Sequence, residues 1–202
     1  MNRVKSQLCA LYDYVSVLVC SMKNKFMMKM IKIGIDPSIN SMGVCVNSDD
    51  ESYKYFLISS AKHRNMPDWI DQRIYNKENR GKKFHDEDIV KNIDMILDEL
   101  DTILEDYYDD DVVVNIEGPS YLSKGKAAID LPGLNMCIRL FLYQRGLKVN
   151  VVSPMSNKKF ATGAGWSKKD AMIEAWRRAE KIDEVSSKVD DVADAYWLSR
   201  FE

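Results

Sequence analysis

Hydrophobic and polar residues alternate in several short segments of the chain, and this two-residue period is typical of β-strands. The first segment, MIKIGID at residues 30–36, is rich in β-branched residues and is followed by the turn residues Pro37 and Ser38. The segment 112–117 is almost continuously hydrophobic, which predicts a strand buried on both faces. We predict five strands, at residues 30–36, 43–46, 53–59, 112–117 and 149–153.

A three- and four-residue hydrophobic spacing occurs elsewhere and predicts helices. It is clearest at residues 86–108, where isoleucines and leucines fall on one face and acidic residues on the other. Ser167 fits a helix N-cap, because Asp170 follows at the third position of a capping box. Pro154 is expected to end the last strand. The predicted helices span residues 86–108, 130–145, 167–181 and 189–201.

This order of elements predicts an α/β fold. Three strands form an antiparallel meander, two parallel strands join them in a mixed five-stranded sheet, and helices flank the sheet. Residues 62–84 are basic and aromatic without clear periodicity, so we expect a loop or short helix there. Residues 30–202 are predicted to form one domain. Residues 1–29 are expected to be an N-terminal extension, dispensable if translation starts at Met27, Met28 or Met30.

Composition and charge narrow the function classes. The chain has 202 residues, 46% hydrophobic and 30% charged, enough for a folded core. The net charge of −2 argues against a nonspecific polycation, yet basic residues concentrate at 119–181 and favour an anion-binding face. Four cysteines without a CxxC pair predict reduced thiols in an intracellular, non-secreted protein. No apolar stretch reaches the roughly 20 residues that span a bilayer, so we expect no membrane association.

Four acidic residues stand at positions that favour a shared site: Asp36, Glu117, Asp191 and Asp194. The first two end predicted strands, each before a turn that contains proline. The last two are three residues apart on an otherwise apolar helix, so they share a face. Strand-end carboxylates of open α/β sheets face the ligand crevice, and neighbouring strands would bring all four together. Any one of them alone is more often a turn former or a solvated residue; only the combination favours a site.

Such a cluster of carboxylates repels itself unless protons or cations neutralise it. Carboxylate oxygens without Cys or His suit Mg²⁺ or Mn²⁺. Two such ions about 3.5–4 Å apart promote phosphodiester hydrolysis. The pattern therefore predicts a divalent-metal site for phosphoryl chemistry.

Four patches of the sequence resemble, in order, the motifs of RuvC-type Holliday-junction resolvases, a family of ribonuclease-H-like nucleases with phage and large-DNA-virus members. The patches are residues 33–38 with 43–46, residues 116–119, residues 153–170 and residues 189–195. The resemblance implies the ribonuclease-H-like fold, with the same order of strands and helices. The sequence departs from the family at Ser38, where glycine is frequent, and residues 1–29 have no counterpart.

The resemblance also implies roles for individual residues. It makes four acidic residues the catalytic ligands of two Mg²⁺ ions, for which Mn²⁺ substitutes: Asp36, Glu117, Asp191 and Asp194. Asp190 is the alternative to Asp191. Lys169, with Lys168 as the alternative, matches the active-site lysine that stabilises charge in the transition state.

Basic residues near these motifs are expected to contact DNA phosphates. Tyr121 is suited to stack on a base near an opened junction, and packing at a strand end explains this residue equally well. The expected DNA contacts are Tyr121, Lys124, Lys126, Lys158, Lys159 and Lys168. The resemblance implies a homodimer whose two equivalent sites nick strands of like polarity. The hydrophobic residues of the 130–145 helix cover enough surface for a core and a partner, or for burial within one subunit.

These observations favour a Mg²⁺-dependent, structure-selective crossover junction endodeoxyribonuclease. It would resolve four-way or branched DNA by paired nicks and need no small-molecule cofactor. One alternative is a related nuclease that acts on RNA–DNA hybrids or other branched DNA, and another is a noncatalytic dimer that binds branched DNA. An actin-like kinase shares the GIDP motif at residues 34–37, but it requires a second glycine-rich hairpin and a much longer chain.

Overall fold

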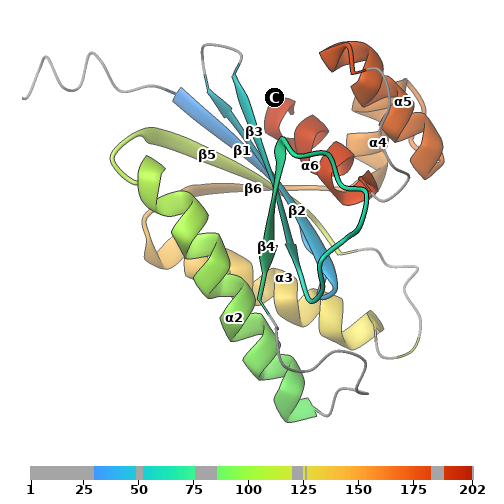
Figure 1. The fold of residues 1–202 in the computed structure, drawn as a ribbon. Coiled ribbons are helices and arrows are strands. Elements are labelled where there is room, and N and C mark those ends of the chain that lie inside the picture. The colour runs from blue at the N-terminus through green and yellow to red at the C-terminus, as the bar shows by residue number, and fades with distance from the viewer. Residues whose placement is uncertain are drawn as a thin grey trace, which may run out of the picture.

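The computed structural model describes residues 30–48, 52–75, 86–119, 125, 127–182 and 189–201. Its centre is a six-stranded sheet in the order β4-β3-β2-β1-β5-β6 (Figure 1). The strands are β1 (Met30–Asp36), β2 (Ser41–Ser48), β3 (Tyr53–Ser59), β4 (Ile70–Ile74), β5 (Asp111–Glu117) and β6 (Lys148–Val152). The helices are α2 (Asp86–Leu104), the short η1 (Glu105–Tyr107), α3 (Ala127–Gln144), α4 (Pro154–Thr162), α5 (Lys169–Glu180) and α6 (Asp190–Arg200).

The predicted meander and parallel strands are both present. Strand β2 pairs antiparallel with β1 and with β3. Strand β5 lies parallel to β1 on its other side, and β6 lies parallel to β5. Ile35 aligns with Ile116 across the β1–β5 pair, so the two strands end at the same edge of the sheet. The mixed α/β class predicted from the sequence is therefore confirmed.

The sheet has six strands rather than the predicted five. The additional strand, β4, falls within residues 62–84, for which the sequence pattern predicts a loop or short helix. It reads IDQRI, and only Ile70 is buried, so its hydrophobic alternation is too weak to indicate a strand. Parallel hydrogen bonding to β3 holds this edge strand in the sheet.

Two further corrections concern the segment between β6 and α5. Residues 154–162 form α4, a helix that the sequence pattern does not predict. Ser153 caps it through its side chain, and Pro154 occupies the first turn, where a missing N–H costs nothing. Ser167 is not the N-cap of α5, because Lys168 occupies that position. The Ser167 hydroxyl instead donates to a backbone carbonyl three residues earlier, at 2.9 Å.

Helices cover both faces of the sheet, which gives the domain three layers (Figure 1). On one face, the β-branched residues of the central strands meet Leu100 of α2 and Leu134 of α3. On the other face, Trp176 of α5 and Tyr196 of α6 pack with Tyr55 of β3. Burial on both faces accounts for the continuous hydrophobic run of β5.

Two glycines allow α6 to lie very close to the central strands. A Cβ atom on Gly34 would lie 1.9 Å from a backbone oxygen of α6, and one on Gly43 would lie 2.0 Å from the carbonyl oxygen of Asp191. Asn115 of β5 fixes the other end of the helix, because its side-chain amide donates to two carbonyl oxygens there, both at 2.9 Å. The first turn of α6 consequently lies beside Asp36, the residue paired with Gly43.

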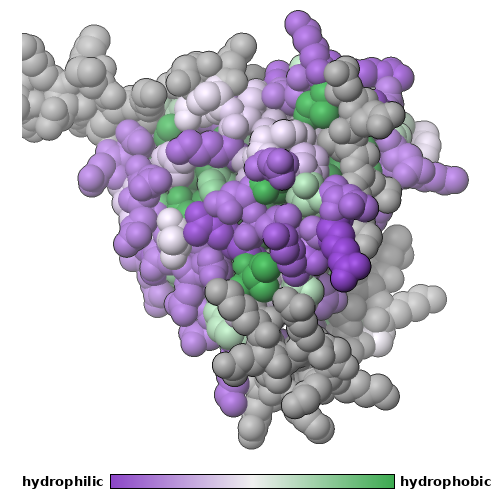
Figure 2. All heavy atoms as spheres, viewed as in Figure 1, coloured by the Kyte–Doolittle hydropathy of each residue, from purple (hydrophilic) through white to green (hydrophobic). Residues whose placement is uncertain are grey.

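Hydrophilic side chains cover most of the described surface in the view of Figure 2, and hydrophobic residues appear there as small separate patches. Within the described ranges, no helix combines the length and the apolar content that crossing a bilayer requires. Cys45 and Cys137 both carry free thiols.

Candidate active site

The carboxyl ends of β1 and β5 bring the first two predicted acidic residues together. Asp36 is the last residue of β1, Glu117 is the last residue of β5, and the two strands are hydrogen-bonded neighbours. After burial, the negative charge of Glu117 makes the largest contribution to raising the pKa of Asp36. The two carboxylates therefore lie within electrostatic reach of each other, as their positions at neighbouring strand ends predict.

Helix α6 adds the other two acidic residues from its first turns. Asp191 accepts a hydrogen bond from the hydroxyl of Ser41 on β2, at 2.5 Å to Oδ2. The charges of Asp194 and Asp191 both raise the pKa of Asp36, so they lie within its electrostatic reach. The structure thus gathers one carboxylate cluster, which consists of Asp36, Glu117, Asp191 and Asp194.

Burial raises the pKa of every member of the carboxylate cluster, because removal from water penalises the charged form. The pKa of Asp191 rises to about 6 and that of Asp194 to about 7, with burial as the largest cause in each. The pKa of Asp36 is raised well above its ordinary value, and that of Glu117 is also raised. Without a cation, part of the cluster therefore holds protons near neutral pH.

The chemistry of the carboxylate cluster fits a hard divalent cation. All four side chains are carboxylates, and Oδ1 of Asp194 is buried without a hydrogen-bond partner. A cation would satisfy this oxygen and neutralise the mutual repulsion. As they stand in the described part of the chain, no three His, Cys, Asp or Glu side chains are grouped tightly enough to hold a metal ion.

Of the two candidate lysines, Lys169 lies near the acidic residues of α6. It forms an ion pair with Asp190, and that hydrogen bond raises the pKa of Lys169. Its positive charge also lowers the pKa of Asp36 and of Asp191. Both lysines are exposed, and Lys168 is the N-cap residue of α5. Asp190 therefore pairs with Lys169, whereas Asp191 belongs to the carboxylate cluster.

Helix α4 contributes two residues whose place in the site was not predicted. Asn157 is fully buried, and its Nδ2 donates to the carbonyl oxygen of Asp194 at 3.2 Å and to Oε2 of Glu117 at 3.5 Å. Lys158, predicted only as a DNA contact, lies close enough for its charge to lower the pKa of both carboxylates. The serine–proline pair at residues 153–154 is the available sequence signal for this helix, but the hydrophobic pattern of α4 does not indicate which of its faces is buried.

The remaining predicted DNA contacts fall partly outside the described residues. Lys159 on α4 and Lys168 at the start of α5 are exposed. Tyr121, Lys124 and Lys126 lie outside the described residues, as does the segment 1–29.

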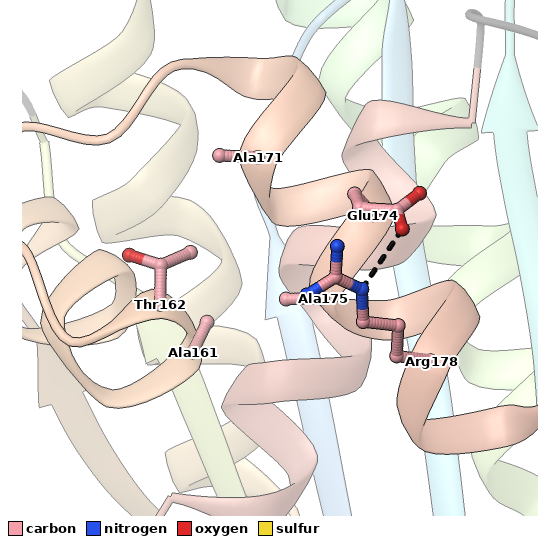
Figure 3. A pocket seen from close by; sticks show the side chains of 6 residues that line it. All are labelled: Ala161, Thr162, Ala171, Glu174, Ala175 and Arg178. Atoms are coloured by element: carbon pink, nitrogen blue, oxygen red, sulfur yellow. Dashed lines mark hydrogen bonds and ion pairs between the residues drawn. The ribbon is translucent and has the colours of Figure 1, made fainter.

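Two hollows of about 450 Å³ each border α4, one of them on the side of α5 and the other at the turn that follows α4. One lies between the two helices and is lined by small side chains together with Glu174 and Arg178 (Figure 3). These two charged residues form an ion pair at 2.9 Å, so their charges already compensate each other. The other hollow, which we call the Trp166 groove, is lined by Met155, Ser156, Lys159, Gly163, Ala164, Gly165 and Trp166.

The three-layer arrangement and the order of the strands define a ribonuclease-H-like fold of the RuvC type. The structure is similar to that of Thermus thermophilus RuvC, with a TM-score of 0.55 and 17% sequence identity over 85% of this chain and 91% of that chain. It is likewise similar to T. thermophilus RuvC in complex with a Holliday junction substrate, with a TM-score of 0.53 and 16% identity over 85% and 90% of the two chains. No protein-family model and no curated protein matches the chain. The structural comparisons confirm the predicted fold.

Proposed function

We propose that this protein is a divalent-metal-dependent endonuclease that resolves Holliday junctions or related branched DNA. The observation that carries this proposal is the carboxylate cluster, which β1, β5 and α6 assemble at one edge of the sheet. The fold similarity to a RuvC in complex with a Holliday junction supports the substrate class.

The carboxylate cluster is proposed to hold two Mg²⁺ ions, with Mn²⁺ as a substitute. Such ions supply Lewis-acid activation for phosphodiester hydrolysis, and no small-molecule cofactor is required. Ser41 orients the carboxylate of Asp191 through its hydrogen bond. Asn157 ties Glu117 to the backbone of α6 and so keeps the strand and helix contributions in register.

Two lysines border the carboxylate cluster and are proposed to act on the phosphate. Lys169 approaches from α5 and Lys158 from α4, and each lowers the pKa of cluster carboxylates. Positive charges placed in this way stabilise the negative charge that develops on the phosphate oxygens in the transition state. Lys159 and Lys168 are exposed and are proposed to contact neighbouring phosphates, together with Tyr121, Lys124 and Lys126.

We also propose that the protein acts as a homodimer. Large hydrophobic side chains of α3 remain 57–77% exposed: Ile129, Met136, Leu140 and Tyr143. Their spacing of seven, four and three residues places them on one side of the helix. A second copy would cover this stripe, and two-fold symmetry would supply the two equivalent sites that paired nicks require.

Residues 30–202 are proposed to carry the complete nuclease domain, acting on DNA inside the cell. Every residue of the carboxylate cluster falls within this range. A protein that starts at Met30 should therefore cleave as the full chain does, and loss of cleavage on this truncation would contradict the assignment.

The decisive experiment is a cleavage assay with the full chain on a labelled synthetic four-way junction, an RNA–DNA hybrid and a linear duplex. We expect paired symmetric nicks in the junction alone, present with Mg²⁺ and absent with EDTA. Asp36→Asn should lower the cleavage rate at least about 10²-fold and leave junction binding largely intact. Asp94→Asn, at an exposed position on α2, is the matched control.

The other outcomes of this assay are equally informative. Cleavage of the hybrid alone would support the assignment of the active site but would show that the substrate is an RNA–DNA hybrid and not a junction. Binding without cleavage in Mg²⁺ and in Mn²⁺ would identify a noncatalytic DNA-binding protein. Full cleavage by Asp36→Asn would remove the metal-site assignment.

A further inference from the structure

The Trp166 groove presents an unusual surface. Trp166 is 85% exposed and Met155 is 65% exposed, whereas Trp176 and Trp197 take part in aromatic contacts within the domain. An indole beside an exposed thioether forms a joint apolar surface, and rimmed apolar surfaces of this kind often mark binding sites. Neither side chain belongs to the carboxylate cluster or to the exposed hydrophobic residues of α3.

The walls of the Trp166 groove are held in place by short local contacts. A Cβ atom on Gly165 would lie 3.1 Å from the backbone oxygen of Met155, so the turn packs closely on α4. The hydroxyls of Thr162 and Ser167 lie 2.6 Å apart, and the Ser167 hydroxyl also donates to the carbonyl oxygen of Ala164. A turn fixed in this way presents the indole as a pre-organised platform, which lowers the entropy cost of binding.

The Trp166 groove and the carboxylate cluster are both bordered by residues of α4 and of the segment that leads into α5. Helix α4 directs Asn157 onto Glu117, and the adjacent Ser156 lines the groove. At the other wall, Trp166 lies three residues before Lys169, and Lys169 pairs with Asp190. The lining includes one basic residue and no acidic one. This charge complements the phosphate backbone of a nucleic acid.

We propose that the Trp166 groove receives one unpaired nucleobase of the DNA strand whose backbone reaches the carboxylate cluster. The base would stack on the indole of Trp166 beside Met155, and Lys159 would contact the flanking phosphate. This inference rests on the proposed function and specifies how branched DNA is selected. A base at a branch point has lost part of the stacking that holds it within a linear duplex and is more easily unpaired, so such a groove favours binding to junctions over binding to duplex.

A thermodynamic cycle measured by DNA binding in EDTA tests the proposal. Trp166→Ala and the unsubstituted protein are each bound to an intact junction, to junctions with one abasic nucleotide near the branch point, and to a linear duplex.

Trp166→Ala should weaken binding of the intact junction about tenfold or more and leave duplex binding unchanged. One abasic position should weaken binding by the unsubstituted protein similarly, with little further loss in Trp166→Ala. Trp166→Phe should retain most of the affinity, and Val90→Ala, exposed on α2, is the control.

The proposal is overturned if Trp166→Ala binds the junction with the affinity of the unsubstituted protein, or if no abasic position couples to it. It is also overturned if Trp166→Ala changes the oligomeric mass in sedimentation, because the groove would then be a subunit contact. Cleavage is scored separately in Mg²⁺. A coupled base without cleavage contradicts the nuclease and keeps the groove assignment, whereas cleavage with an uncoupled Trp166 contradicts the groove assignment alone.

Discussion

The absence of a side chain at Gly43 determines how close Asp191 comes to the central strands. A Cβ atom at Gly43 would lie 2.0 Å from the carbonyl oxygen of Asp191, well inside van der Waals contact. Gly43 is paired with Asp36 across the β1–β2 ladder, so this one contact joins both halves of the carboxylate cluster. The spacing between the strand-end and helix carboxylates therefore depends on backbone packing as well as on the acidic residues themselves.

Gly43→Ala should separate α6 from the sheet. The added methyl group overlaps backbone atoms, which cannot rotate away, so we expect a cost of about 2–3 kcal/mol and a melting temperature lower by roughly 4–12 °C. Cleavage should fall further than stability explains, because Asp191 moves away from Asp36. Gly133→Ala is the control: nothing lies within 4 Å of its Cβ position on α3. A Gly43→Ala protein with unchanged melting and cleavage would show that α6 does not depend on this contact.

Substitution of the two lysines at the start of α5 should separate their roles. Lys169→Met removes the charge next to Asp190 and the carboxylate cluster, so we expect the single-turnover cleavage rate to fall about 10²-fold at saturating junction. Lys168→Met should instead weaken junction binding modestly and reduce its salt dependence, as loss of one phosphate contact does. Equal rate losses in the two variants would contradict the assignment of Lys169.

Neighbouring lysines on α4 offer a second matched pair. Burial raises the pKa of Glu117 and Asp194, and the positive charge of Lys158 opposes this rise, whereas Lys159 is exposed and lines the Trp166 groove. We expect Lys158→Met to lower the single-turnover rate about 10- to 100-fold with little change in junction affinity. Lys159→Met should weaken affinity, and low salt should restore most of the loss. The reverse pattern would place Lys159, and not Lys158, at the reacting phosphate.

The strand ends and the acidic helix were predictable because each leaves a strong local pattern. The GID and IEG segments end apolar strands, and the acids of α6 interrupt an apolar helix. Strand β4 was not predictable in this way, since pairing with β3 stabilises it more than its own alternation does. Helix α4 is not predictable for a related reason, because its buried position is occupied by the polar residue Asn157.

The contacts that shape the site depend on residues distant in the sequence. Ser41 and Asp191 are 150 positions apart, and no local pattern connects them. The close approach at Gly43 has the same character, because a glycine within a strand is compatible with a bulge, a bend or close packing. The residue types of the site were therefore predictable, but the groups that orient them were not.

The pH dependence of stability in the metal-free protein follows from the raised pKa values of Asp191 and Asp194. Both rise from an ordinary value of 3.8, to about 6 and about 7, chiefly through burial. The folded protein therefore binds more protons than the unfolded chain between about pH 4 and 7, and stability falls as pH rises through that window. In EDTA, the melting temperature should decrease from pH 5 to pH 8. Asp194→Asn should flatten this slope, whereas Asp94→Asn should preserve it.

A divalent cation should reverse this loss where the carboxylates are ionised. A ligand that binds only the folded state raises the melting temperature as its concentration increases. Because metal ions bind ionised carboxylates, Mg²⁺ or Mn²⁺ should stabilise the protein more at pH 8 than at pH 5. Asp36→Asn should reduce this metal-dependent increase, because it removes one ligand and one repelling charge. Both trends are read by calorimetry or fluorescence melting without DNA. A melting temperature that stays flat or rises from pH 5 to 8 in EDTA, with no response to metal, would contradict the buried carboxylate cluster as a cation site.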